Sequence, residues 1–142
     1  MIDQDQVYED WKKRFPLCFK KEGCCMYHGL SFESGWNKIV EKALTKIEAH
    51  LATVPQDEEH TFQIDQMKEK FGVLRWYATV YDDVIPKIII DAEDESEKTC
   101  MLCGKEGSLH KKSSGGFWML TLCPECAEKN DYIMCSKEKT DE

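Results

Sequence analysis

Hydrophobic residues recur every three or four positions in three segments of the chain, which is the spacing of one helix face. The first segment covers residues 3–14. The second is the most regular and runs from Ser34, whose side chain can cap a helix, to Pro55, which stops it. The third begins near Asp82 or Asp83 and becomes strongly acidic at its end. We therefore expect three helices, each with one buried face.

Two segments between the second and third helices follow a strand pattern instead. Residues 61–67 alternate between hydrophobic and polar, and residues 73–81 are rich in β-branched and aromatic types. The sequence KEKFG joins them, and its Gly72 can adopt a positive φ. This predicts a hairpin with Phe62 and Ile64 facing the long helix. The expected fold class is α+β, with helices packed on a small antiparallel β-hairpin sheet.

Charge is unevenly distributed along the 142 residues. The formal net charge is −8, with thirteen Lys and Arg against twenty Asp and Glu in residues 1–99, but four against three in residues 100–130. Binding along a phosphate backbone needs clustered cations, so this balance argues against broad contact with nucleic acid. It suits either solubility or a protein partner with a basic surface.

The chain carries no sequence feature typical of secretion or of a membrane span. Its start, MIDQDQVYED, is acidic where a signal peptide is basic and then apolar. The longest apolar stretch, VIPKIII, is far shorter than the roughly 20 residues that cross a bilayer. We therefore expect a cytoplasmic protein, in which eight cysteines indicate metal binding more than disulfides.

Two Cys-x-x-Cys pairs, in CMLCG and LCPEC, carry the clearest chemical signal. Nineteen residues separate them and contain a second hairpin pattern, SLHKK, SSGG and FWMLTL. Zinc prefers four thiolates in a tetrahedron, and two such pairs about 15 to 20 residues apart are typical of a zinc site. Gly104 fits the tight turn after the first pair. The predicted ligands of one Zn²⁺ ion are Cys100, Cys103, Cys123 and Cys126.

This pattern resembles the zinc-ribbon family over about residues 98–130. The resemblance implies a structural zinc with a closed coordination shell, which stabilises a hairpin too small to fold alone. We expect an α+β body in residues 1–98, a ribbon in residues 99–131, and a flexible tail in residues 132–142 from which Tyr132 and Ile133 can pack back.

A second metal site is a weaker hypothesis. Cys24, Cys25 and His28 have a Cys-x-x-His spacing, and Cys18 could supply a fourth ligand. Buried or free thiols are the preferred explanation for these cysteines.

Enzymatic interpretations lack required residues. A zinc deaminase needs a His-x-Glu motif, and no histidine here has one. The ribbon also resembles the zinc frame of HNH and related recombination endonucleases, in which His110 would be followed by a second metal ligand. Lys111, Lys112 and Ser113 stand there instead, so the resemblance implies at most a degenerate nuclease. Catalysis is therefore not expected.

A wider resemblance covers nearly the whole chain. The ordered set SGW, QMKEKFGVLRWY, the acidic third helix, CMLCG and TLCPEC is similar to a family of small proteins encoded by bacteriophages and prophages. The resemblance implies a one-domain α+β body ending in the ribbon, and no established reaction. Many members carry a cysteine where this chain has Phe32, which argues against a second metal near Cys25.

The leading functional hypothesis is a non-enzymatic zinc protein that binds a host protein. The alternative is nucleic-acid binding. One candidate surface is the hairpin set of Lys68, Lys70, Arg75 and Trp76, in which the aromatic side chain is either exposed for stacking or part of the core. The other is the ribbon set of Lys105, Lys111, Lys112 and Trp118.

Overall fold

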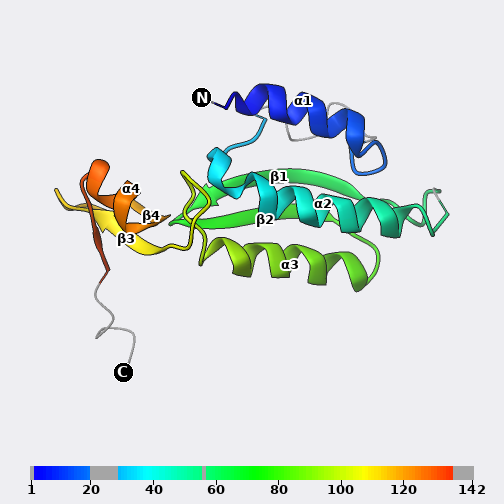
Figure 1. The fold of residues 1–142 in the computed structure, drawn as a ribbon. Helices are drawn as coiled ribbons and strands as arrows, with labels where there is room; N and C mark the ends of the chain where they lie inside the picture. Colours follow the sequence, from blue (N-terminus) through cyan, green and yellow to red (C-terminus); the bar gives the residue numbers. More distant parts are fainter. Residues whose placement is uncertain (1, 20–28, 56, 136–142) are drawn as a thin grey trace.

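The protein has a mixed α+β fold, as the sequence predicts (Figure 1). The computed structural model describes residues 2–19, 29–55 and 57–135. Within these residues, no helix combines the length and the apolar character needed to cross a bilayer. The elements in chain order are α1 (Gln4–Arg14), the short 3₁₀ helix η2 (Ser34–Trp36), α2 (Asn37–Leu51), β1 (Gln63–Lys70), β2 (Val73–Thr79), α3 (Val84–Ser96), β3 (Ser108–Lys112), β4 (Met119–Leu122), α4 (Pro124–Lys129) and β5 (Tyr132–Met134).

The three predicted helices are confirmed, with one correction at the start of the second. Asp3 caps α1 by accepting a hydrogen bond from the Asp5 amide. Ser34 does not cap α2, because it opens the single turn of η2 and α2 follows from Asn37. The periodic residues of α2 all face inward, as a 3.6-residue repeat requires. Those buried are Ile39, Val40, Ala43, Leu44, Ile47 and Leu51.

The predicted hairpin forms with a shorter turn than expected. Strands β1 and β2 pair antiparallel as far as Lys70 and Val73, so only Phe71 and Gly72 connect them. Both turn residues have positive φ, 54° and 83°. This is the geometry of a two-residue hairpin turn whose twist matches that of the strands. The sequence suggested a longer connection because Phe is uncommon in such a turn.

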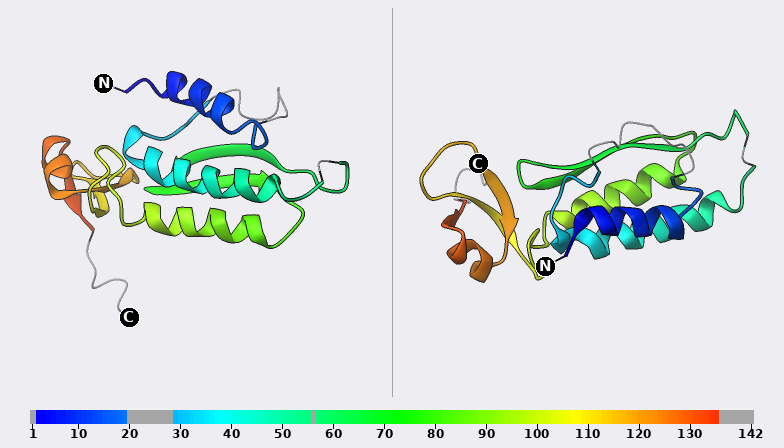
Figure 2. Two further views of the ribbon diagram at one scale, coloured as in Figure 1. Left: turned by 45° about the vertical axis from the view of Figure 1, so that its right-hand side comes forward. Right: turned by 90° about the horizontal axis from the view of Figure 1, so that it is seen from above.

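Helices α2 and α3 cover one face of the β1–β2 sheet, and no helix of the described residues lies on the other face (Figure 2). Phe62 and Ile64 are buried at 1% exposure each, as predicted. The free edge of β2 lies against α3, where Ser96 Oγ accepts from the Leu74 amide and Glu93 Oε2 accepts from the Trp76 amide. Side chains of α3 thus satisfy edge amides that would otherwise need another strand.

The second sheet is antiparallel with the strand order β4-β3-β5. Its first two strands are the predicted ribbon hairpin. The third strand corrects the predicted tail, because Tyr132–Met134 form β5 and Tyr132 is buried. Residues 136–142 of that tail lie outside the described residues.

The ribbon packs directly on the body. Gly35 N–H donates to the Met101 carbonyl at 2.7 Å, and the Trp36 indole N–H donates to the Thr99 carbonyl at 2.9 Å. Met101 belongs to the main hydrophobic core. On the other side, the Thr121 hydroxyl donates to the carbonyl of Gly72 in the hairpin turn. These contacts fix the position of the first Cys-x-x-Cys loop.

Acid is expected to weaken the connection between α2 and α3. Asp82 accepts from the Val84 and Ile85 amides, and from His50 Nε2 at 2.7 Å. Burial acts to raise the pKa of the Asp82 carboxyl, but the hydrogen bonds from His50 and Ile85 outweigh it and lower the pKa below 3.8. A lowered pKa adds stability above about pH 4, and that stability is lost as the pH falls through the folded-state value.

The Asp82→Asn variant tests this expectation, because it removes the charge and keeps an oxygen acceptor for the cap. At neutral pH it should unfold about 1 kcal/mol more easily in urea than the wild type. The difference should shrink as the pH falls through the lowered pKa of folded Asp82, since below that pKa both side chains are neutral. A difference that stays constant across this pH range would contradict the expectation.

Candidate metal centre

Two local structures present the four cysteines of the Cys-x-x-Cys pairs. Cys100 and Cys103 lie on the loop that follows α3, where the Gly104 amide donates to the Cys100 carbonyl at 2.9 Å. Gly104 has a φ of +86°, which explains why glycine follows the second cysteine. Cys123 is the N-cap of α4, and Cys126 lies in that helix. The sequence did not predict α4, which begins with Pro at its first position.

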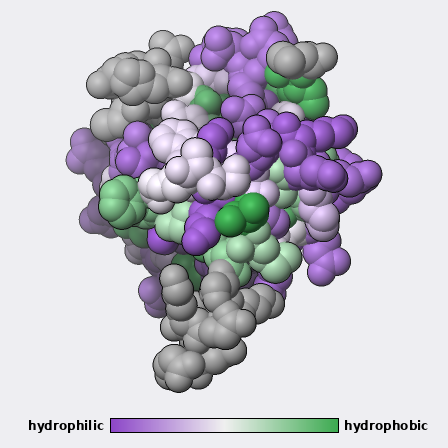
Figure 3. Space-filling model, turned by 90° about the vertical axis from the view of Figure 1, so that its left-hand side faces the viewer, coloured by the Kyte–Doolittle hydropathy of each residue, from purple (hydrophilic) through white to green (hydrophobic). Residues whose placement is uncertain are grey.

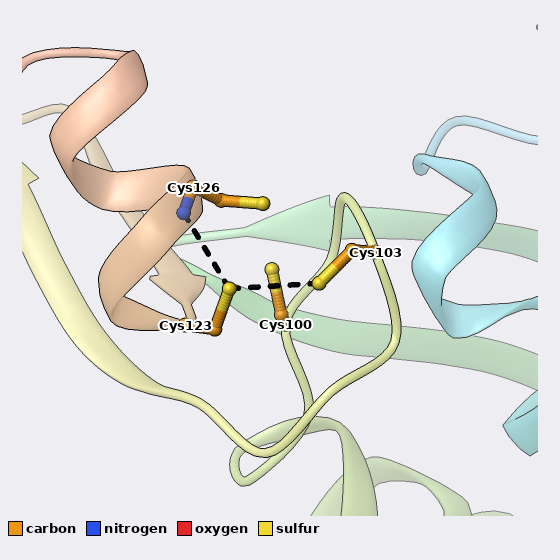
Figure 4. Close-up of side chains that lie close together, drawn as sticks. All are labelled: Cys100, Cys103, Cys123 and Cys126. Atoms are coloured by element: carbon orange, nitrogen blue, oxygen red, sulfur yellow. Dashed lines mark hydrogen bonds between the residues drawn. The ribbon is translucent and has the colours of Figure 1, made fainter.

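The four sulfurs face a common point (Figure 4). All lie within 4.8 Å of one another, and the Sγ atoms of Cys103 and Cys123 are 3.5 Å apart. Thiolates about 2.3 Å from one zinc ion at tetrahedral angles would be about 3.8 Å apart. The six cysteines that the structure describes are free thiols. The cluster therefore fits a tetrahedral metal ion, and it is not a pair of disulfides.

The surroundings of Cys123 favour its thiolate. The Cys126 amide donates to Cys123 Sγ, and this bond outweighs burial to lower the pKa of Cys123 to about 7. Burial raises the pKa of Cys103 and of Cys126, and neighbouring thiols add to the effect at Cys126. A divalent cation would reverse these increases, because it binds the deprotonated form. Cys100 is fully buried and Cys103 exposed, so the cluster lies at the surface with one side in the ribbon core.

The second predicted metal site gains no support. Cys18 is buried in the main core, and its thiol lies 3.7 Å from the Leu44 carbonyl oxygen, to which it donates. Burial, with the nearby Glu48 carboxylate, raises the pKa of Cys18 far above its ordinary value. Cys24, Cys25 and His28 lie outside the described residues. Among the described residues, the cluster at Cys100 is the one group of potential ligands close enough to hold a metal.

His110 is a structural residue of β3. It is 3% exposed, and its Nδ1 bonds to the Ser108 carbonyl at 2.7 Å. The residues after it, Lys111 and Lys112, supply no metal ligand. The described residues thus offer His110 no second ligand of the kind an HNH-type nuclease centre requires.

In the predicted hairpin surface, the exposed aromatic residue is Tyr77 and not Trp76. Trp76 is 4% exposed and shares the helix-facing side of β2 with Leu74, so it belongs to the core. Its neighbour Tyr77 is 46% exposed on the opposite face with Arg75. Neighbouring residues of a strand point to opposite faces, so Trp76 and Tyr77 cannot both face the core. Leu74 is buried, and Trp76, two residues later, points to the same side, which leaves Tyr77 exposed. Lys68 lies directly opposite Arg75, and Lys70 lies two residues further along β1, on the same face.

Of the predicted ribbon surface, Lys112 and Trp118 lie together, whereas Lys105 lies elsewhere, on the metal loop. Lys105 pairs with Glu125 at 3.2 Å on the outside of the metal loop. Lys112 lies over the Tyr132 ring, 5.0 Å from its centroid. Lys112 and Trp118 both line a cleft of about 530 Å³ between the ribbon and the segment that precedes η2. The sequence missed Phe117, which is 91% exposed beside Trp118 at the end of the hairpin.

Comparison of the chain with protein-family models, with curated proteins and with solved structures finds no match.

Proposed function

We propose that this protein binds one structural zinc ion and that the zinc-stabilised ribbon carries a surface for another protein. The observation that supports the first half is the convergence of four thiols within 4.8 Å. Four thiolates in a tetrahedron are typical of zinc, and of iron in some proteins. Four protein ligands leave no open position for substrate or water, which supports a structural role.

Elemental analysis of purified protein tests the metal. We expect about one zinc atom per chain, and replacement by Co²⁺ should give the absorption of a tetrahedral tetrathiolate site. The Cys103→Ser variant should lose both, because it removes one of the four ligands. Stoichiometric iron would contradict the zinc assignment, and protein fully folded without any metal would contradict the structural role.

A protein partner is supported by the hydrophobic side chains at the ribbon end. Phe117 and Trp118 are 91% and 63% exposed. The two glycines before them, Gly115 and Gly116, also lie in open space, since a Cβ atom added to either would have no neighbour within 4 Å. Green and pale residues gather in the middle of this end, with hydrophilic residues around them (Figure 3). Aromatic anchors beside a cleft are typical of protein interfaces. The ribbon's nearly balanced charge gives no comparable support to phosphate binding.

Affinity capture with paired variants tests the partner. The double substitution Phe117→Ser/Trp118→Ser should reduce recovery of a specific protein about tenfold or more, because interface aromatics carry much of the binding energy. The control is Val84→Ser/Ile90→Ser on α3, which removes two apolar side chains of 47% and 53% exposure elsewhere. The partner would be a host protein if the chain is of bacteriophage origin, as the wider resemblance implies. Equal recovery with both double variants would contradict this surface.

A further inference from the structure

The helix-free face of the β1–β2 sheet is cationic, although the protein as a whole is acidic. Between the bulge at Asp65 and the turn, strand alternation places three residues of each strand outward, and none of these six is acidic. Asp65 lies beyond them at the far end of the hairpin, where it accepts hydrogen bonds from Gln63 and Thr79. Within the part of the chain that the structure describes, helices cover only the opposite face (Figure 2, right). The outward residues are Gln66, Lys68 and Lys70 of β1, and Val73, Arg75 and Tyr77 of β2.

Among the residues that the structure describes, no carboxylate pairs with the cations on this face. Lys68 and Arg75 lie directly opposite each other, and Lys70 follows on the same side. Across residues 2–19, 29–55 and 57–135, the ion pairs use other cations, and the three here form none. Like charges directly opposite one another on a sheet oppose folding. An anionic ligand would turn this repulsion into attraction.

Two aromatic rings stand at the ends of the cationic row. Tyr77 is 46% exposed beyond Arg75, and Phe71 is 55% exposed in the turn, with Lys70 Nζ 6.0 Å from its ring centroid. Phe71 holds a φ of 54°, which is unfavourable for a residue with a bulky side chain. The turn therefore keeps an exposed ring in a strained backbone position, and neither burial nor backbone preference explains its presence.

We propose that this face, which we name the hairpin face (Lys68, Lys70, Phe71, Arg75 and Tyr77), binds single-stranded nucleic acid. Cations on alternate strand residues are about 7 Å apart, a separation that suits successive phosphates of an extended strand. Exposed rings beside such a row give unpaired bases a surface on which to stack. An acidic peptide would use the cations and gain little from two flat rings.

Binding through three cations on an acidic protein should be weak and should depend on salt concentration. Three cations neutralise about three phosphates, so the logarithm of the affinity should fall with the logarithm of salt with a slope of about −2. The net charge of −8 repels the ligand at long range and limits the affinity further. Binding is therefore expected at low salt and should largely disappear at physiological salt.

Fluorescence anisotropy of a labelled oligothymidylate of about twelve nucleotides tests the proposal with zinc-loaded full-length protein. Saturable binding is expected at about 20 mM salt, with the slope given above. The variant K68E/K70E should weaken it at least tenfold. The control K38E/K46E changes the net charge equally on exposed positions of α2 and should stay within about twofold of the wild type.

Further measurements separate the ligand classes and guard against misfolding. Tyr77→Ser should weaken binding at least fivefold, because it removes a stacking ring and no charge. K68E leaves opposite charges facing each other, so the melting temperature of K68E/K70E should not fall. The proposal would be overturned by absence of binding at low salt, by equal affinity for a duplex, by equal competition from oligoglutamate, or by equal effects of the two charge variants.

Discussion

Replacing Cys123 with serine is expected to unfold the ribbon and to lower the protein's stability by several kcal/mol. Cys123 supplies one of four clustered thiols, so its loss removes a metal ligand, whereas the serine hydroxyl can still cap α4 at this position. Metal binding contributes directly to folding in small ribbons. Zinc content should fall well below one per chain, and the melting temperature and the ribbon's circular dichroism should fall with it.

Cys135→Ser is the matched control, because Cys135 is a free thiol of the same end of the chain outside the cluster. It should keep its zinc and its melting temperature. Removing the metal from the wild type with a chelator should reproduce the effect of Cys123→Ser. If the two serine variants melt alike and both retain full structure, the four-cysteine cluster does not stabilise the ribbon.

Gly35→Ala is expected to destabilise the protein by about 3 kcal/mol or more, although it adds a single methyl group. The added Cβ would lie inside van der Waals contact of the carbonyl oxygens of Cys100 and Met101. These are backbone atoms of the metal loop, which cannot turn away as a flexible side chain can. Either the loop moves and the sulfurs separate, or the Gly35–Met101 hydrogen bond breaks.

Chemical denaturation together with zinc affinity measures this effect, and Gly115→Ala is the comparison. Gly115 has a φ of +98° and nothing within 4 Å of an added Cβ, so its substitution introduces backbone strain without a clash. It should cost about 1 kcal/mol and leave the zinc affinity unchanged. Equal effects of the two alanine variants would show that contact with the metal loop does not matter.

Much of the fold follows from local pattern. The spacing of Ile39, Leu44 and Ile47 predicts α2, since a helix places such residues on one face whatever it packs against. Alternation and the ribbon's glycines likewise predict both hairpins. The convergence of the four cysteines also follows, because each Cys-x-x-Cys pair brings two sulfurs together and a hairpin between the pairs brings the pairs together.

The local sequence pattern does not determine the conformation of residues whose structure depends on tertiary contacts. Ser34 is a good cap by type, yet the approach of Met101 places it in a 3₁₀ turn. Tyr132 follows a polar segment, yet β3 offers it an open edge and β5 forms there. Short elements such as these gain most of their stability from tertiary contacts, so sequence alone gives little sign of them.

By itself, the sequence determined the three long helices α1, α2 and α3, the two hairpins and the grouping of the thiols, because these depend on residues near one another in the chain. Only the tertiary structure decided that Trp76 faces the core and Tyr77 faces outward, since a strand has two faces that local alternation does not distinguish. It also decided that Gly35 and Gly72 contact the ribbon. Those contacts join segments far apart in the chain, and packing of the whole core is what brings them together.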